Sequence, residues 1–326
     1  MSARHLVTGA AGVIGFELTQ QLLQAGDHVL AVDDGRKGGF EDLEALARAH
    51  AQQLDVRKLD LAREHPLAGD AALTRGGAFD SFFHLAAIVG VRYVTDHPWE
   101  TIDVNLRSTL NVLALARDVR PKTVLFASSS ENYASSVEHG FARVPTGEDV
   151  LLSIDDIALP RWSYAASKIA GESAVFAAAR DGAFTPVVVR FHNIYGPRMG
   201  PTHVIPEFLA RCKRRDDPFP IFGSDQTRSF LYVEDAGRAL RIVLDAGRRG
   251  AGGTYNIGAE IETKIADLAR VVFDVTGHRP RIDERPAPPG SVSRRVPDVT
   301  KLTALGFRPT VALTDGVRAC WQTSRA

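Results

Sequence analysis

A tyrosine and a lysine four residues apart are the side chains of this sequence best suited to proton transfer. Tyr164 and Lys168 stand at the head of a helical pattern that runs to about Arg180, and residues at i and i+4 share one face of a helix. Tyrosine titrates at about pH 10, and a neighbouring cation favours its phenolate form. We therefore expect Tyr164 to act as a general base whose pKa is lowered by Lys168.

Three consecutive serines offer hydroxyl groups to the same reaction. Ser128, Ser129 and Ser130 end an apolar, β-branched run that begins at Thr123. A doubly wound parallel sheet binds its ligands at the carboxyl ends of its strands, so a hydroxyl here can hydrogen bond the substrate oxygen that faces Tyr164. The sequence therefore predicts a Ser/Tyr/Lys catalytic set.

A glycine-rich turn predicts a dinucleotide site. Gly9, Gly12 and Gly15 follow the first strand pattern in the run TGAAGVIG, and Val13 and Ile14 stand between them at the start of a helical pattern. Glycines suit this turn because a pyrophosphate must approach bare backbone at a helix N-terminus.

Two carboxylates at the end of the second strand pattern indicate which dinucleotide binds. Asp33 and Asp34 follow Gly15 at the distance expected of a ribose-binding acid, about 20 residues. A carboxylate there accepts both ribose hydroxyls and repels a 2′-phosphate, which favours NAD over NADP. The positive charge of the oxidised nicotinamide would also lower the pKa of Tyr164.

Alternating strand and helix patterns must position these residues. Strand-like runs occur at 5–8, 28–33, 53–56, 81–85, 123–128 and 186–191, and the helical patterns between them include 15–25 and 106–116. The alternation predicts an α/β fold with a doubly wound parallel sheet of the Rossmann type. Proline and glycine punctuation after Gly196 predicts a smaller carboxy-terminal α/β lobe that binds the substrate. We assign residues 1–195 and a returning segment at about 229–260 to an NAD-binding domain, and residues 196–228 and 261–326 to the smaller lobe.

Composition and charge exclude several classes of partner. The 326 residues carry 39 basic and 39 acidic side chains, so we expect no binding to nucleic acid or to an anionic membrane surface. Cys212 and Cys320 stand in no disulfide or metal pattern, and His84 and His192 have no second ligand at metal spacing, so we expect no metal. With no leader pattern and no apolar run of about 20 residues, we expect a cytoplasmic protein.

Six motifs in order carry a resemblance to a known family. Besides TGAAGVIG and YAASK, they are HLAA at 84–87, RFHNIYGPR at 190–198, RSFLYVED at 228–235 and a closing PG-x-x-x-R at 289–294. Over nearly all its length the chain resembles an extended short-chain dehydrogenase/reductase of the NAD-dependent epimerase/dehydratase family. The resemblance implies that NAD takes a hydride from C4 of a nucleotide-diphosphate sugar while Tyr164 takes the hydroxyl proton. The 4-keto sugar is then epimerised, dehydrated or decarboxylated, and usually reduced again.

The resemblance also implies roles for individual residues. Ser129 would bind the reacting oxygen, Lys168 the nicotinamide ribose and Asp60 the adenine. The other implied cofactor contacts are Leu61, Leu85, Ala86, Ala87, Asn105 and Ser128. Arginine suits a diphosphate because it binds phosphate oxygens bidentately, and the implied substrate contacts are Val89, Ser130, Asn193, Arg198, Val204, Arg228 and Arg294. Relatives commonly pair two helices per subunit, so we expect a homodimer that uses the helix at 106–116.

Glu131 leaves three reactions open. In related 4,6-dehydratases and uronate decarboxylases a carboxylate at this position acts near C5 or the sugar carboxyl, and a glutamate there can remove an acidified C5 proton. Ser130 stands where thymidine-sugar dehydratases carry an aspartate, and Asn132 and Ala134 depart from the usual loop sequence. Because epimerases are the commonest members, the sequence favours 4-epimerisation over dehydration or decarboxylation. A non-catalytic NAD-sensing scaffold is the alternative of another class, although such relatives usually lose the tyrosine or the lysine.

Overall fold

A seven-stranded sheet forms the centre of the structure, a computed structural model that describes residues 2–63, 67, 70, 73, 79–287 and 291–325. Pro289 and Gly290 of the predicted closing motif lie outside the described residues. The strand order is β11-β6-β5-β4-β1-β2-β3, and every neighbouring pair is parallel. This topology confirms the predicted doubly wound α/β fold. The strands are β1 (Arg4–Thr8), β2 (His28–Asp33), β3 (Leu54–Lys58), β4 (Ser81–His84), β5 (Thr123–Ser129), β6 (Thr185–Phe191) and β11 (Gly253–Ile257).

The central strands form where the sequence is apolar and β-branched without interruption. β5 is buried from its first residue to Ser128, and β6 is buried from Val187 to Arg190. Continuous burial is expected of parallel strands that carry helices on both faces. β3 is exposed at several positions because it is the edge strand of the sheet.

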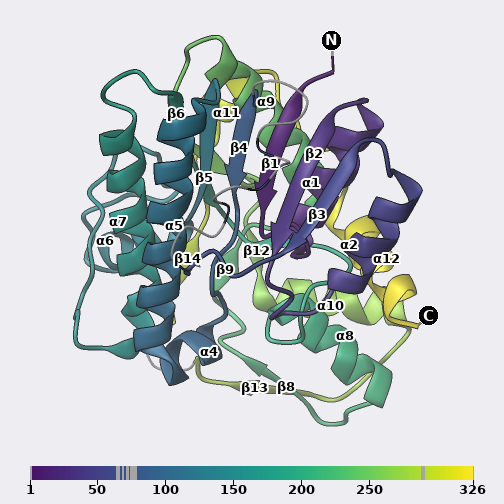
Figure 1. Cartoon of the computed structure of the whole chain (residues 1–326). Coiled ribbons are helices and arrows are strands. Elements are labelled where there is room, and N and C mark those ends of the chain that lie inside the picture. Colours follow the sequence, from purple (N-terminus) through teal and green to yellow (C-terminus); the bar gives the residue numbers. More distant parts are fainter. Residues whose placement is uncertain are drawn as a thin grey trace.

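Two layers of helices cover the sheet. One apolar core joins the sheet to α1 (Val13–Gln24), α2 (Phe40–Ala49), α9 (Val233–Arg248) and α11 (Thr300–Ala304). A second core on the opposite face joins it to α5 (Pro98–Val119) and α7 (Ser163–Ala178). Figure 1 shows α5 and α7 side by side on that face, and the two helices are in contact. The short helices α4 (Val91–Asp96), α6 (Ala134–Glu138), η1 (Ser130–Tyr133) and η2 (Pro160–Trp162) lie in the connections.

A third apolar core holds the carboxy-terminal elements together. Its helices are α8 (Val204–Arg214), α10 (Ile265–Thr276) and α12 (Leu313–Arg325), and its largest strand pair is β8 (Phe219–Phe222) with β13 (Ile282–Arg285). Smaller pairings join β7 (Ile194–Tyr195) to β10 (Leu231–Tyr232), and β9 (Thr227–Arg228) to β12 (Thr263–Lys264) and β14 (Arg294–Arg295). The segment at 229–260 returns to the sheet, because it supplies α9 and the seventh strand, β11.

The parallel sheet gathers its strand ends at one edge. β1, β2, β4, β5 and β6 all run in the same direction, so the residues that end them lie along that edge. In Figure 1 this edge faces the elements of the third core, α8, α10, β8 and β13. In the described part of the chain, no helix is long and apolar enough to cross a membrane.

Candidate active site

The predicted catalytic side chains meet where β5 ends and α7 begins. Ser129 ends β5, and its hydroxyl shares a hydrogen bond with the Tyr164 hydroxyl. Lys168 lies one turn further along α7, with its Nζ 5.8 Å from the centre of the Tyr164 ring. The same Nζ donates to the carbonyl oxygen of Ala127 at 2.7 Å. The structure therefore brings the three side chains together, and their catalytic roles stay predictions.

Burial shifts the acidity of this set in both directions. It raises the pKa of Tyr164 to about 12, against a smaller lowering by the hydrogen bond with Ser129. It lowers the pKa of Lys168 to about 7, against a smaller raising by the carboxylate of Glu172. The protein alone thus does not acidify Tyr164 as the sequence analysis expects. A lower pKa for Tyr164 depends on the positive charge that a bound cofactor brings.

A buried ion pair supports β5 and α7 from beneath the site. Arg190 of β6 donates to Glu172 of α7 at 2.6 Å, and both side chains are at most 7% exposed. The other carboxylate oxygen of Glu172 accepts from Ser128 at 2.5 Å and from Asn132 at 2.9 Å. The hydroxyl of Ser128 is therefore engaged in this network, so a cofactor contact from Ser128 would use its backbone. Asn132 departs from the family pattern, yet its amide nitrogen donates to both Ser128 and Glu172 here.

Asn105 links the segment after β4 to the catalytic helix. Its Oδ1 accepts from the backbone nitrogen of Ile88 at 2.7 Å, and its Nδ2 donates to the hydroxyl of Ser167 at 3.1 Å. Only 3% of Asn105 is exposed. We infer that Asn105 fixes the spacing between these two segments. Val89 follows Ile88, and its carbonyl oxygen accepts from Lys37.

The glycine-rich turn has the shape that a pyrophosphate needs. Gly9 has a φ of +70°, and a Cβ there would lie 2.7 Å from the backbone nitrogen of Ala86. A Cβ on Gly15 would lie 2.1 Å from the carbonyl oxygen of Gly9. Within α1, all of which the structure describes, no side chain caps Gly12 and the first turn carries no acidic residue. The N–H groups of this helix end are therefore open to an anion.

Asp33 ends β2 and turns back towards the glycine-rich turn. Its two carboxylate oxygens accept from the backbone nitrogens of Ala11 at 3.0 Å and Gly35 at 2.8 Å. Burial raises the pKa of Asp33. Asp34 lies beside it and forms an ion pair with Arg36 at 3.3 Å. Asp33 is thus the carboxylate that lies against the turn.

The other predicted cofactor contacts lie along the same edge of the sheet. Asp60 accepts from the backbone nitrogen of Ala62 in the turn after β3, and the neighbouring Leu61 is buried. Leu85, Ala86 and Ala87 directly follow the end of β4. Val13 and Ile14 lie at the start of α1.

Three arginines surround Glu131, whose role the sequence leaves open. Arg295 of β14 donates to its Oε1 at 2.7 Å, and Arg161 of η2 lies 3.9 Å from its Oε2. Burial alone would raise the pKa of Glu131, yet Arg295, and less strongly Arg161 and Arg228, lower it overall. Glu131 also acts electrostatically on Tyr164. The charged cluster therefore adjoins the catalytic set.

Arg295 and Arg161 are site residues that the sequence analysis missed. Neighbouring side chains on a strand point to opposite faces, so only one of Arg294 and Arg295 in β14 can reach Glu131. Arg294 instead makes two hydrogen bonds of 2.8 Å with Glu262 at the surface. The side chain of Arg294 therefore does not reach Glu131, and its role in substrate binding stays a prediction. The sequence shows the pair of adjacent arginines, but it does not indicate which of the two turns inward.

Arg228 is available for an anionic ligand. Its guanidinium donates to the carbonyl oxygens of Thr227 at 2.8 Å and Ser293 at 3.4 Å, and among the described residues it forms no salt bridge. Burial, and then repulsion from Arg295, lowers its pKa to about 10. At neutral pH Arg228 therefore stays charged, with Glu131 and Glu138 near enough to act on it electrostatically. Asn193 lies close to Arg228, because its Nδ2 donates to the carbonyl oxygen of the next residue, Ser229.

Three further predicted substrate contacts have surroundings that do not indicate a role in substrate binding. Arg198 lies over the glycine-rich turn, with its guanidinium 4.0 Å from the ring centre of Phe16. Val204 begins α8 and packs on the third apolar core. Ser130 begins η1 and is 4% exposed. The roles predicted for these residues in substrate binding stay predictions.

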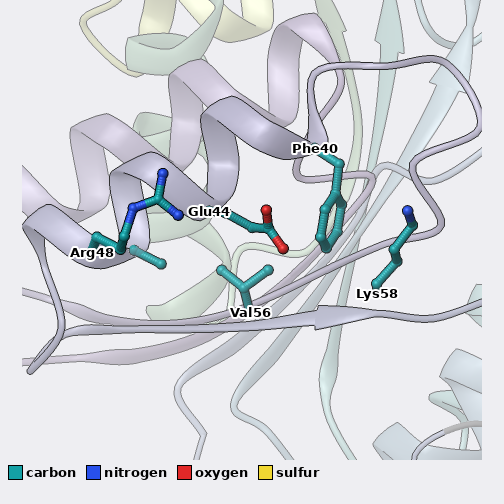
Figure 2. Close-up of a pocket in the computed structure, with 6 residues that line it drawn as sticks. Phe40, Glu44, Arg48, Val56 and Lys58 are labelled. Atoms are coloured by element: carbon teal, nitrogen blue, oxygen red, sulfur yellow. The ribbon is translucent and has the colours of Figure 1, made fainter.

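An open hollow of about 360 Å³ lies between α2 and β3, outside the candidate site. Figure 2 shows Phe40, Glu44 and Arg48 of α2 on one side and Val56 and Lys58 of β3 on the other. None of the predicted site residues lines it. In the described ranges of the chain, no three His, Cys, Asp or Glu side chains form a metal-binding group, and the absence of a metal stays a prediction.

Comparison with known proteins gives the family context of this site. Residues 5–258 match the model of the NAD dependent epimerase/dehydratase family. The chain is 34% identical to the UDP-N-acetyl-alpha-D-glucosaminuronate decarboxylase of Bacillus cytotoxicus, over 98% of this chain and 96% of the relative.

Two solved structures are similar to nearly the whole chain. The UDP-glucose 4-epimerase of Thermotoga maritima with UDP-glucose has a TM-score of 0.85 and 25% identity, and the match covers 99% of this chain and 98% of that one. The UDP-glucuronic acid 4-epimerase of Bacillus cereus, in complex with UDP-glucuronic acid and NAD, has a TM-score of 0.83 and 25% identity, with 99% of each chain covered.

Proposed function

Because the chain belongs to the NAD-dependent epimerase/dehydratase family, we propose that it decarboxylates a nucleotide-diphosphate uronic acid through a 4-keto sugar. Members of this family are NAD-dependent enzymes of nucleotide-sugar conversion, and this chain is one of them. The proposal differs from the 4-epimerisation that the sequence alone favours. The reason is the set of charges around Glu131.

The observation that carries the proposal is the group of three arginines beside Glu131. Glu131 neutralises one of the three cations and Glu138 acts on Arg228, which leaves one excess positive charge beside Ser129 and Tyr164. Arg228 suits the substrate diphosphate. Arg295 and Arg161, which already lie beside Glu131, then mark the place of a second anionic group, and a uronic acid carries such a group at C6. A neutral hexose would add no negative charge to this positive cluster.

A buried donor strengthens this argument. Within the described residues, the Nε of Arg295 has no hydrogen-bond partner although it is buried. Buried donors are normally satisfied, so an unpaired one in a binding site indicates a ligand acceptor. A sugar carboxylate accepts hydrogen bonds from guanidinium in the bidentate geometry that arginine prefers.

The residues present fit NAD. The glycine-rich turn is open where a Cβ would collide with backbone, and Asp33 ends β2 as a ribose-binding acid would. Gly9, Gly12 and the start of α1 would hold the pyrophosphate, and Lys168 the nicotinamide ribose. When bound, NAD supplies reversible hydride transfer at C4 of the sugar.

The chain's own residues explain the remaining steps of the reaction. Tyr164 takes the proton of the C4 hydroxyl while Ser129 hydrogen bonds the same oxygen. In the resulting 4-keto sugar, the C5–C6 bond breaks and its electron pair moves into C5, C4 and the C4 oxygen as carbon dioxide leaves. Ser129 and Tyr164 stabilise the negative oxygen of this enolate by hydrogen bonding. A proton then adds at C5 before the ketone is reduced.

The state of Glu131 argues against dehydration. Arg295 keeps its pKa low, so Glu131 is a weak base and a poor proton donor at neutral pH. Expulsion of a 6-hydroxyl needs an acid, and the neighbouring Ser130 is not one. An ionised Glu131 instead repels the substrate carboxylate and, held by Arg295, favours its loss as neutral carbon dioxide.

The test is to incubate the purified protein with UDP-glucuronic acid, UDP-N-acetylglucosaminuronic acid and UDP-glucose, without added reductant. Mass spectrometry and proton NMR follow the products, and we expect a uronic acid to lose carbon dioxide. A product of unchanged mass would contradict the proposal in favour of epimerisation, and loss of water would favour dehydration. No turnover with bound NAD would favour the non-catalytic alternative.

Two neighbouring arginines provide a matched pair of variants. Arg295→Ala should lower kcat/KM for the uronic acid by about 10²-fold or more, because it leaves Glu131 and the substrate carboxylate unpaired. Arg294→Ala should change it by less than about threefold, because it removes an exposed ion pair. Equal losses in the two variants would contradict the assignment of Arg295 and restore the sequence prediction for Arg294.

A further inference from the structure

Arg198 is built into the wall of the cofactor site. It is the last residue of the motif at 190–198, yet its guanidinium reaches back to the glycine-rich turn. One nitrogen lies 3.5 Å from the carbonyl oxygen of Ala11 and 3.4 Å from that of Gly39. The other pairs with the carboxylate of Asp42 on α2. The guanidinium also stacks at 4.0 Å on the ring of Phe16 on α1.

The surrounding backbone makes room for this side chain. Gly39 has a φ of +76°, and a Cβ there would lie 2.6 Å from the guanidinium of Arg198 and 2.8 Å from the carbonyl oxygen of Ala11. Arg198 itself has a φ of +73°, a conformation that costs free energy for a non-glycine residue.

A second contact crosses the same region. Lys37, in the loop between β2 and α2, donates to the carbonyl oxygen of Val89. Burial, and then the nearby charge of Lys37, lowers the pKa of His203, so the segment that follows Arg198 also lies close to this loop. Three segments, at 34–42, 88–90 and 198–203, thus meet around the glycine-rich turn.

We propose that Arg198 and Asp42 form a clamp that closes the NAD site and sets the rate at which the cofactor leaves. Arg198 is a positioning residue, because it acts through the turn and the loop at 34–39. Arginine suits this task because its planar group bonds two carbonyl oxygens and a carboxylate while it stacks on a ring. The proposal rests on the use of NAD and not on which sugar is converted.

The test is the dissociation rate of NAD from wild type, Arg198→Ala, Asp42→Ala and the double variant, measured after dilution into an excess of NADH as a fluorescent competitor. In Arg198→Ala we expect a rate about 10- to 100-fold higher, the size expected for loss of charge-assisted contacts. The NAD content of the purified protein should fall. Arg198→Lys should recover only part of the effect.

The double variant separates a clamp from a general loss of structure. If Arg198 and Asp42 act as one unit, the double variant dissociates no faster than Arg198→Ala alone. Arg214→Ala is the control, because Arg214 makes a comparable exposed pair with Asp216 at the end of α8. An unchanged dissociation rate in Arg198→Ala, additive effects in the double variant, or an equal effect of Arg214→Ala would each overturn the proposal. None of these results depends on whether a uronic acid is decarboxylated.

Discussion

At the scale of single residues, Tyr164 and Lys168 have pKa values that burial shifts in opposite directions. The phenol becomes a weaker acid, with a pKa of about 12, and the ammonium a stronger one, with a pKa of about 7. Both shifts disfavour charge in the protein without ligands. The cationic ring of an oxidised nicotinamide and an anionic substrate would change this balance, so the site is prepared for catalysis only when both are bound.

The lowered pKa of Lys168 predicts how stability depends on pH. The folded state binds fewer protons than the unfolded state between about pH 7 and the ordinary lysine pKa of 10.5. The free energy of unfolding should therefore rise with pH across that window, by at most about 4 kcal/mol from this group. Below about pH 7 Lys168 is charged in both states, and the full cost of burying the charge remains.

The measurement is urea unfolding of the ligand-free protein and of Lys168→Met at about pH 7 and pH 10. Other titrating groups contribute equally to both proteins and cancel in the difference. We expect wild type to gain stability relative to Lys168→Met at the higher pH. Parallel pH dependences in the two proteins would mean that Lys168 is not held in a desolvated state.

At the scale of elements, one buried network fixes the strands and the helix that carry the site. Glu172 of α7 and Arg190 of β6 form its centre, and Ser128 attaches the end of β5. Arg190 also donates to the hydroxyl of Tyr133, which donates in turn to Asn256 of β11 at 2.8 Å. The ion pair and its hydrogen bonds therefore link α7 and η1 to three strands that the sheet already holds side by side.

Removal of one partner from this network should destabilise the protein strongly. Glu172→Ala leaves Arg190 charged and buried without its carboxylate, which typically costs about 3–5 kcal/mol. Asp315→Ala is the control, because Asp315 pairs with Arg318 on the exposed face of α12 and such a pair contributes at most about 1 kcal/mol. Equal free energies of unfolding for the two variants, measured in urea, would show that the network does not hold these elements together.

The periodic elements could be predicted from the sequence because each depends on local pattern. The strands at 28–33 and 81–85 appear within one residue of the predicted ends, and the seventh strand comes from the returning segment at 229–260. Side-chain direction in short irregular segments could not be predicted in this way. β14 has only two residues, too few for a hydrophobic alternation to indicate that Arg295 turns inward and Arg294 outward.

The partners of residues that act across elements could not be predicted either, for a physical reason. The course of the loops brings Arg161 and Arg198 to their partners, and no residue spacing in the sequence indicates that course. Glu172 stands one turn beyond Lys168 on the predicted helix, so its burial could have been suspected from the helical period, but its partner on β6 could not. Motif resemblance assigned Arg198 to the substrate, whereas its contacts are with the cofactor turn and α2.

At the scale of the whole molecule, the outer face of α5 carries apolar side chains that the monomer leaves exposed. Trp99 is 76% exposed and Leu110 is 55% exposed. They lie about three helical turns apart and so share one face. Phe176 of the neighbouring α7 is also partly exposed. This surface agrees with the expectation of a homodimer built on the helix at 106–116, which stays a prediction.

The dimer prediction is tested by sedimentation of wild type and two glutamate variants. In a two-fold interface each substitution is present twice, so Leu110→Glu would bring two charges into an apolar contact and should yield monomers. Ile157→Glu is the control, because Ile157 is 87% exposed in the loop before η2 and lies outside both helices. Leu110 is exposed in the monomer, so circular dichroism should report an unchanged fold. A monomeric wild type, or dissociation by Ile157→Glu alone, would place any contact between copies elsewhere than on α5 and α7.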